Sequence, residues 1–474
     1  MAESLITRRG CASADVETGQ YEVRFIDYDG TVLKTQWVDA GQDATPPENP
    51  SHTDKGLTFQ GWLSGDDYTN IQRDSDIGAI YTTTDGKTHV HVIVDWNSYA
   101  NTRQFWLGFY KSDTSTLSVD WGNGTITTNS NSGNIAMQSP DYPATNPRAY
   151  TIKIWISSGS GWYGIGKLAS GMNSRFFLQT ETTSDQGYNG RFLQKFYTGD
   201  NVKIFNNYTL DYSGKCSEIT LSNGVEVIGH HAFRGASGIS GLNMPNSIVQ
   251  SGKEYNAAVN VWSDAPFSGI MHLKNIVLSK NAPLFHSSAP YENANAIQRM
   301  FQSSYFIKKI IFPATETNNS TTSTAFSNMF IDCISLEKVI NAPFSRMTNI
   351  NPAASCFYGC RGLREMPQGL LPNNGGWKQI SASMFNEASN IRFFDIPSHI
   401  TVINASAFSQ CANVKYFIFR SATVPTLANA NAFPTLTAPT AFSIYVPDAS
   451  VAAYKAATNW SSFAYFIRPL SEIE

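Results

Sequence analysis

The stretch that decides the fold is "ITLSNGVEVIGHHAFRGASGISGLNMPNSI", from Ile219 to Ile248. It joins a short strand-like run to a turn that carries an Ala-Phe pair, and the phrase recurs through the C-terminal half. The anchoring phenylalanines lie 23 to 34 residues apart, at Phe233, Phe267, Phe301, Phe330, Phe357, Phe385 and Phe408. This period predicts a solenoid, in which each unit buries its apolar face only by stacking on the next.

The end of the chain reads as a cap for this solenoid. In "YVPDASVAAYKAAT", Asp448 is expected to cap a helix that starts near Ala449. A helix of this kind would close the open end of the last repeat. The long insertions at residues 248–264 and 314–324 are expected to form loops on one face, often the binding face of a solenoid.

Three of the six cysteines, Cys333, Cys360 and Cys411, each lie three residues after a repeat phenylalanine. Other repeats hold Ala or Ile at this position, which indicates a small buried apolar slot. A free cysteine packs in such a slot as a small hydrophobe. We therefore expect packing rather than a metal site or a disulfide, since Cys356 and Cys360 lack a second metal-spaced pair.

The N-terminal half has a different pattern. Asp29-Gly30 separates two strand-like runs and predicts a hairpin. Pro46, Pro47 and Pro50 exclude continuous regular structure after it. Residues 88–157 hold further strand-like runs between polar turns, including "VDWGNGT" from Val119 to Thr125.

Three family resemblances follow from these phrases. The repeats resemble leucine-rich repeats of the BspA type. Residues 21–84 resemble the Listeria–Bacteroides repeat of internalin-type surface proteins, on "VRFIDYDGTVLKTQWVDAGQDATPP", "FQGW" and "IGAIYT". "VDWGNGT" followed by "YTIKIWI" resembles PKD-like domains of the immunoglobulin type, with Asn123 in place of the usual Asp. The resemblances imply a β-grasp-like module, an immunoglobulin-like β-sandwich and a leucine-rich-repeat solenoid.

We accordingly predict a mainly β, multidomain protein. The expected parts are an N-terminal anchoring segment (1–20), a β-grasp-like repeat (21–84), a PKD/Ig-like β-sandwich (85–172), the solenoid (173–440) and a C-terminal cap with a helix (441–474).

Composition limits the classes of partner. Charged residues make up 15% of the chain and the formal net charge is −3. This balance, without a basic stripe, predicts no nucleic acid partner and no membrane insertion. Arg8 and Arg9 follow the apolar pair Leu5-Ile6, the reverse of the order in a signal peptide. We expect from this order a chain made in the cytoplasm and not exported by the usual route.

No nucleophile, metal or phosphate motif occurs, so we predict no catalytic residue, no metal site and no cofactor. His89 and His91 share a strand face without a third ligand, and alternation is expected to expose them. His230 and His231 are expected to be structural. A carboxylate pair of a glycosidase stays open, because such pairs are chosen by spatial distance.

Aromatic residues are the better candidates for binding, because exposed rings stack on sugars and anchor protein partners. Those in loops or near repeat edges are Trp155, Trp162, Tyr163, Tyr255, Trp262 and Trp377. The alternative for each is core packing. Our candidate ligand-binding residues are Tyr255, Trp262 and Trp377.

The modules together suggest a non-enzymatic phage structural protein, such as a head fibre, tail fibre or receptor-binding appendage. Residues 1–20 would bind other virion proteins, the two β domains would form a stalk, and the solenoid would meet a host surface glycan or protein. We expect a homo-oligomer, with a trimer by analogy with fibres, assembled in the host cytoplasm and located on the virion. The alternative is a bacterial cell-surface or secreted BspA-like adhesin that binds host matrix or mucin. A third possibility, a surface-glycan hydrolase, would need a carboxylate pair in a cleft.

Overall fold

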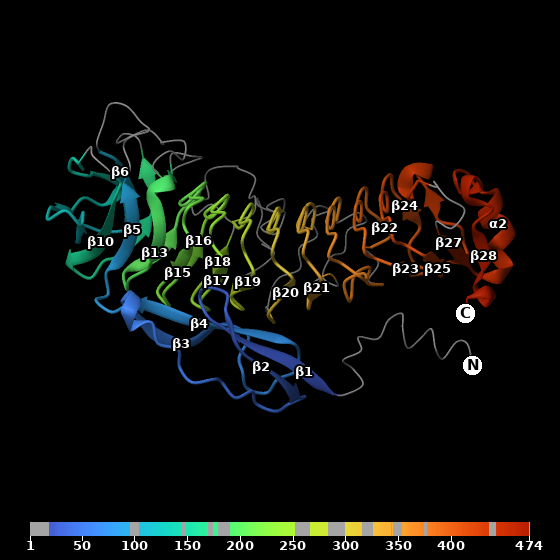
Figure 1. Cartoon of the computed structure of the whole chain (residues 1–474), viewed down its shortest axis with the longest axis horizontal. Helices are drawn as coiled ribbons and strands as arrows, with labels where there is room; N and C mark the ends of the chain where they lie inside the picture. Colours follow the sequence, from blue (N-terminus) through green and yellow to red (C-terminus); the bar gives the residue numbers. More distant parts are fainter. Residues whose placement is uncertain are drawn as a thin grey trace. The chain divides into compact units, whose positions relative to one another are not determined.

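The computed structural model describes residues 19–94, 104–143, 147–168, 174–178, 190–251, 266–282, 299–314, 326–342, 344, 353–373, 377–435 and 442–473. The chain forms two compact units, and Figure 1 labels their helices and strands. The N-terminal unit holds Tyr21–Leu284 and Pro313–Thr317, and the C-terminal unit holds Phe285–Phe312 and Asn318–Glu474. Each unit is described by itself.

The N-terminal unit begins with a four-stranded sheet in the order β2-β1-β4-β3. Its strands are β1 (Gln20–Ile26), β2 (Val32–Asp39), β3 (Leu57–Gly65) and β4 (Ser75–Thr83), and η1 (Thr53–Lys55) precedes β3. β4 runs parallel to β1 and antiparallel to β3. The predicted hairpin at Asp29-Gly30 is confirmed: Asp27 N donates to Thr31 O at 2.8 Å, and Gly30 has the positive φ of 86° that favours glycine.

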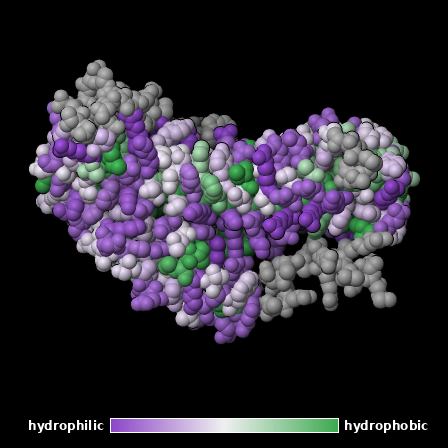
Figure 2. All heavy atoms as spheres, in the orientation of Figure 1, coloured by the Kyte–Doolittle hydropathy of each residue, from purple (hydrophilic) through white to green (hydrophobic). Residues whose placement is uncertain are grey.

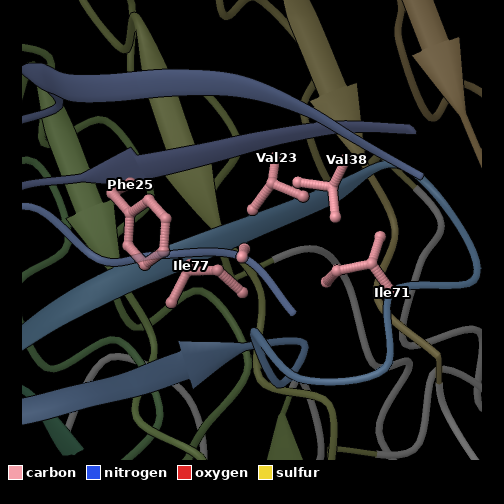
Figure 3. Packing of buried hydrophobic residues seen from close by; sticks show 6 residues of the cluster. Val23, Phe25, Val38, Ile71 and Ile77 are labelled. Carbon is pink, nitrogen blue, oxygen red and sulfur yellow. The ribbon is translucent and has the colours of Figure 1, made fainter. Parts of the chain in front are cut away.

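One face of this sheet buries a compact apolar cluster. Val23 and Phe25 from β1, Val38 from β2 and Ile77 from β4 pack together with Ile71, which comes from the loop before β4 (Figure 3). All five are less than a tenth exposed. The sheet therefore has an apolar core of its own on this face, while β4 is buried along almost its whole length.

Two further sheets of the N-terminal unit each combine the second β block with the first repeats. One has the order β15-β13-β5-β10-β7-β8, and the other has the order β12-β6-β11-β14-β16-β18, with β9 paired to β6. The first contains β5 (Thr88–Val94), β7 (Thr116–Asp120), β8 (Ile126–Asn129), β10 (Arg148–Ser158), β13 (Leu193–Tyr197) and β15 (Glu218–Thr220). The second contains β6 (Trp106–Lys111), β9 (Gly133–Gln138), β11 (Tyr163–Ile165), β12 (Phe177–Leu178), β14 (Val202–Phe205), β16 (Val227–Ile228) and β18 (Gln250–Ser251).

The arrangement of these sheets differs from the predicted boundary at residue 172. β5 pairs with β13 and β11 pairs with β14, so both sheets run across this position. The apolar edges of the second β block are thus covered by repeat strands. The turn predicted in "VDWGNGT" is present: β7 and β8 form an antiparallel hairpin around it, and Trp121 within it is buried.

The repeat strands are short and pair in parallel. In the N-terminal unit β17 (Gly241–Asn243) pairs with β19 (Asn275–Val277). In the C-terminal unit β20 (Lys309–Ile311) pairs with β21 (Lys338–Ile340). Two larger parallel sheets follow there, one of β22 (Gln379–Ile380), β24 (Val402–Ile403) and β26 (Thr426–Leu427), and one of β23 (Phe393–Ile396), β25 (Tyr416–Phe419), β27 (Ser443–Val446) and β28 (Ile467–Pro469).

The end of the chain carries a helix close to the predicted position. α2 (Val451–Ala456) follows η6 (Asp448–Ser450), so it begins two residues later than expected. Asp448 does not cap it; its carboxylate accepts instead from Ser471 N at 3.1 Å. The remaining 3-10 turns are η3 (Gly190–Phe192), η5 (Ala430–Ala432), η7 (Trp460–Phe463) and η8 (Leu470–Glu472). Across the described ranges, no helix has the length and apolar character needed to span a bilayer.

Candidate binding surface

The repeat phenylalanines form stacked ladders inside both units. In the C-terminal unit neighbouring rings lie 5.3–6.0 Å apart and within 25° of parallel. The ladder members are Phe301, Phe330, Phe357, Phe385, Phe408 and Phe433. In the N-terminal unit the rings of Phe233 and Phe267 lie 6.0 Å apart and 7° from parallel. One aromatic ring per coil therefore fills the core and sets the stacking register.

The backbone around each phenylalanine bonds to the next coil. Phe357 N donates to Met384 O at 2.9 Å. The residues two before and two after Phe357 donate to the same next coil: Ser355 N to Ala382 O, and Gly359 N to Asn386 O. Residues at these flanking positions adopt a positive φ, as in Ser383 (53°), Glu387 (62°), Ser406 (56°) and Gln410 (59°). This conformation costs free energy outside glycine, and the bonds between coils offset the cost.

In the N-terminal unit, β4 packs across the short strands of the repeats. β4 contacts β15, β17 and β19. The amide of Asn243 donates to Ile26 O at 2.9 Å and to Ala79 O at 3.0 Å, and the amide of Asn275 donates to Gly30 O at 2.7 Å. Side chains of the repeats thus satisfy backbone carbonyls of the N-terminal sheet, as buried polar groups require.

A close backbone approach fixes the same contact. A Cβ on Gly241 would lie 1.9 Å from Gly30 N, so only glycine fits at this position. Next to it, Ser240 Oγ donates to Asp29 O at 2.9 Å. The hairpin at Asp29-Gly30 is therefore a docking element as well as a turn.

Glu218, on β15, is the electrostatic centre of this interface. Its carboxylate accepts from Tyr28 Oη, Tyr197 Oη and Lys195 Nζ at 2.7 Å each, and from Lys55 Nζ at 3.1 Å. Burial of the carboxylate would raise its pKa, but these four donors outweigh burial and lower it to about 2. Glu218 is therefore ionised at neutral pH and links the N-terminal sheet to the repeats.

A second carboxylate supports the same region. Asp27 accepts from Tyr81 Oη and from Tyr28 N, both at 2.8 Å, and lies 2.7 Å from His52 Nε2. Burial raises the pKa of Tyr81 well above its usual value, so its hydroxyl stays protonated as a donor. The donors that surround Asp27 and Glu218 belong to the protein itself, which favours a structural role for both carboxylates.

In the C-terminal unit the outer side of the parallel strands carries partly exposed aromatic residues. Phe393 and Tyr416 lie eight residues after their ladder phenylalanines, with ring centroids 5.5 Å apart, and Tyr445 continues the row at 6.1 Å. The next residue in each strand, Phe394 or Phe417, points to the opposite side, into the core, and is fully buried. Hydrophilic residues cover most of the face in Figure 2, and hydrophobic residues appear on it as small separate patches.

The repeat geometry agrees with a family comparison. Six copies of a model described as "BspA type Leucine rich repeat region" match residues 179–260, 203–364 and 326–436, together more than half of the chain. The chain belongs to this family. Leucine-rich-repeat families typically hold non-catalytic binding proteins.

Solved leucine-rich repeat proteins are also similar to this BspA-type chain. One from Bacteroides ovatus ATCC 8483 is 17% identical, with 57% of this chain and 76% of that chain covered and a TM-score of 0.29. One from T. pallidum is 18% identical, with 42% and 82% covered and a TM-score of 0.26. A leucine rich cell surface protein from Faecalibacterium prausnitzii A2-165 is 14% identical, with 60% and 90% covered and a TM-score of 0.25. No curated protein sequence matches.

The predicted binding aromatics have different outcomes. Trp377 is fully buried, its Nε1 donates to Phe344 O at 3.1 Å, and its ring packs near Phe326. The interpretation of Trp377 as a ligand contact is thus corrected, because the BspA-type coil uses this ring as core. Tyr255 and Trp262 lie outside the described residues.

The other aromatic candidates lie in the N-terminal unit. Trp155 is half-buried, with Lys87 Nζ 3.9 Å from its ring centroid, and Trp162 is half-buried as well. Tyr163 is buried, and its hydroxyl donates to Thr88 Oγ1 at 2.7 Å. Tyr163 is therefore a packing residue, as the alternative interpretation allowed.

The cysteine slot is confirmed. All five described cysteines are free and buried. In three coils the thiol donates to a repeat-phenylalanine carbonyl in the preceding coil: Cys333 to Phe301 O, Cys360 to Phe330 O and Cys411 to Phe385 O, at 3.0–3.1 Å. Burial raises the pKa of the Cys411 thiol to about 12, which keeps it protonated.

One expectation about the histidines is corrected by the structure. His89 and His91 were expected to be exposed; His89 is only 7% exposed and lies 2.8 Å from Asp85 Oδ1, while the ring of His91 packs against Tyr197. They are covered because β13 pairs with their strand. Among the described residues, no group of three or more His, Cys, Asp or Glu has metal-binding geometry.

The sequence interpretation missed both ends of the ladder pattern. Leu210 occupies the phenylalanine position one coil before Phe233: its N donates to Ala232 O, and Tyr208 and Tyr212 flank it with positive φ. Phe433 completes the ladder after Phe408. The signal for Leu210 was its spacing, since it precedes Phe233 by the same interval that separates Phe385 from Phe408.

Proposed function

We propose that this protein is a non-enzymatic adhesin of the bacterial cell surface, in which the BspA-type solenoid presents a binding face. The observation that carries the proposal is the outer side of the C-terminal strands, where Phe393, Tyr416 and Tyr445 are partly exposed beside charged residues. Partly exposed rings with polar neighbours are suited to binding glycans and proteins. The family membership supports a binding role.

The phage role that the sequence suggested first has no support from the comparisons, and one part of it conflicts with the structure. A stalk would need the first β domain to stand apart from the repeats. Instead, β4 lies on β15, β17 and β19 and is held by Asn243 and Asn275. The expectation of cytoplasmic assembly rested on residues 1–20, of which 1–18 lie outside the described residues.

The resemblance of residues 21–84 to the Listeria–Bacteroides repeat belongs to the same proposal. The sheet order β2-β1-β4-β3, with the central parallel pair of β1 and β4, supports a small β module that docks on the repeats. A host glycan or matrix protein as ligand and a homo-oligomeric state stay predictions. Light scattering coupled to size-exclusion chromatography would measure the oligomeric state.

The decisive experiment is immunogold electron microscopy on a culture of the bacterium that carries the gene. We expect gold on cell envelopes and loss of the label in a deletion strain. A parallel assay would compare the adhesion of wild-type and deletion cells to immobilised mucin. Gold on phage particles with bare envelopes would overturn the adhesin proposal and restore the virion interpretation.

A further inference from the structure

A row of basic residues runs across successive coils of the C-terminal unit. Arg364, Arg392 and Lys415 each lie seven residues after a ladder phenylalanine and are exposed. Lys415 N donates to Arg392 O at 2.6 Å, which places these two residues on adjacent coils. Neighbouring parallel strands lie about 4.8 Å apart, so equivalent side chains on adjacent coils are close neighbours. We call Arg364, Arg392 and Lys415 the basic row.

The charges of the basic row are not neutralised by described residues. None of its three members forms a salt bridge within the described ranges. In the two preceding coils the corresponding residues are Lys308 and Glu337, and these two pair with each other at 3.5 Å. Residues 299–474 carry 13 Lys and Arg against 9 Asp and Glu, although the whole chain has a net charge of −3. The positive charge is therefore local, and a polyanion would be attracted here and repelled elsewhere.

Aromatic rings adjoin the row. Phe393 follows Arg392 and Tyr416 follows Lys415. Their rings stack on each other within 19° of parallel. Each ring therefore uses one face for its neighbour, and the surface offers ring edges and a phenol hydroxyl beside the cations.

We propose that the basic row binds an acidic polysaccharide that carries sulfate or carboxylate groups. The proposal rests on the adhesin function above and names its ligand class. Guanidinium groups bind sulfate and carboxylate through paired hydrogen bonds, and a lysine adds a point charge. A linear acidic polysaccharide carries its negative charges at regular intervals, and the basic row carries one positive charge on each of three successive coils.

Single-stranded nucleic acid fits the surface less well. Proteins that bind it without sequence preference stack successive bases on open aromatic faces. The mutual stacking of Phe393 and Tyr416 occupies the faces that the two rings turn toward each other, so no base can insert between them. A single line of cations also differs from the broad basic surface that contacts the phosphates of a duplex.

The test measures binding of the full chain to fluorescent dextran sulfate at low and physiological ionic strength, with neutral dextran of the same length as control. The variant R392E/K415E reverses two members of the basic row. The matched control K378E/K455E makes the same change of net charge at Lys378, on the residue before β22, and at Lys455 of α2. Thermal unfolding would verify that both variants are folded.

We expect binding to dextran sulfate that weakens with salt, and at least a tenfold loss, about 1.4 kcal/mol, in R392E/K415E. The control variant should lose less than threefold. The inference is overturned if wild-type protein ignores dextran sulfate, if both variants lose affinity equally, or if single-stranded DNA displaces dextran sulfate at lower concentration. Surface labelling and mucin adhesion without polyanion binding would sink this inference and leave the adhesin function standing.

Discussion

Replacing Phe357 by alanine tests whether the aromatic ladder is the stabilising core of the C-terminal unit. Phe357 is fully buried, and its ring lies 5.3 Å from that of Phe330 and 5.5 Å from that of Phe385. Truncation of a buried phenylalanine costs about 3–5 kcal/mol, and a stacked pair contributes about 0.5–1.5 kcal/mol beyond burial. Since two stacked pairs are lost, Phe357 belongs at the upper end of the range for truncation, and we expect the free energy of unfolding to fall by about 4–5 kcal/mol.

Urea denaturation of the full chain, followed by hydrogen exchange of the amides that cross the coils, would measure this loss. The amides of Phe330 and Phe357 both donate to the next coil, so their protection should fall most. Phe306→Ala is the control, because Phe306 is 52% exposed and its truncation should cost less than about 1 kcal/mol. A loss below about 1.5 kcal/mol in Phe357→Ala, or equal losses in both variants, would refute the ladder as the source of stability.

Three further predictions concern other parts of the structure. The pKa of Glu218 is lowered to about 2 from its usual 4.5, so its contribution to docking of the N-terminal sheet is complete above about pH 4.5 and lost as pH falls toward 2. Hydrogen exchange of the amides in β4 should therefore be sensitive to acid in the wild-type chain. This sensitivity should disappear in Glu218→Gln and persist in the control Glu226→Gln. Trp377→Phe should lower the free energy of unfolding in urea by about 1–3 kcal/mol and leave dextran sulfate affinity unchanged, and a selective loss of affinity would restore its binding role. Ellman's reagent at pH 8 should find no more than one reactive thiol in the native chain, Cys11, and all six after unfolding in guanidinium; two or more fast native thiols would contradict burial.

The repeat could be predicted from the sequence because core positions are chemically constrained. Each coil needs one large apolar side chain and a small slot three residues later, and Phe330 with Cys333 shows both. Leu210 was missed because leucine takes the same place in the coil without the aromatic signature. Trp377 was misread because a tryptophan in a loop-like phrase gives no sign of burial, whereas the coil supplies both its packing and the carbonyl of Phe344.

The docking of the N-terminal sheet had no comparable signal in the sequence. It depends on Asn243, Asn275 and Glu218, three polar residues that look like ordinary surface positions in their repeats. Because an amide or carboxylate becomes informative only when its partner is known, patterns within one segment cannot reveal such contacts. The outer strand side is used in the N-terminal unit to bind a sheet of the same chain. In the last coils of the C-terminal unit the same positions carry Arg392, Phe393, Lys415 and Tyr416, which stay partly or fully exposed. This exposure of large cationic and aromatic side chains is the strongest argument for the proposal that the second surface meets a partner from outside the chain.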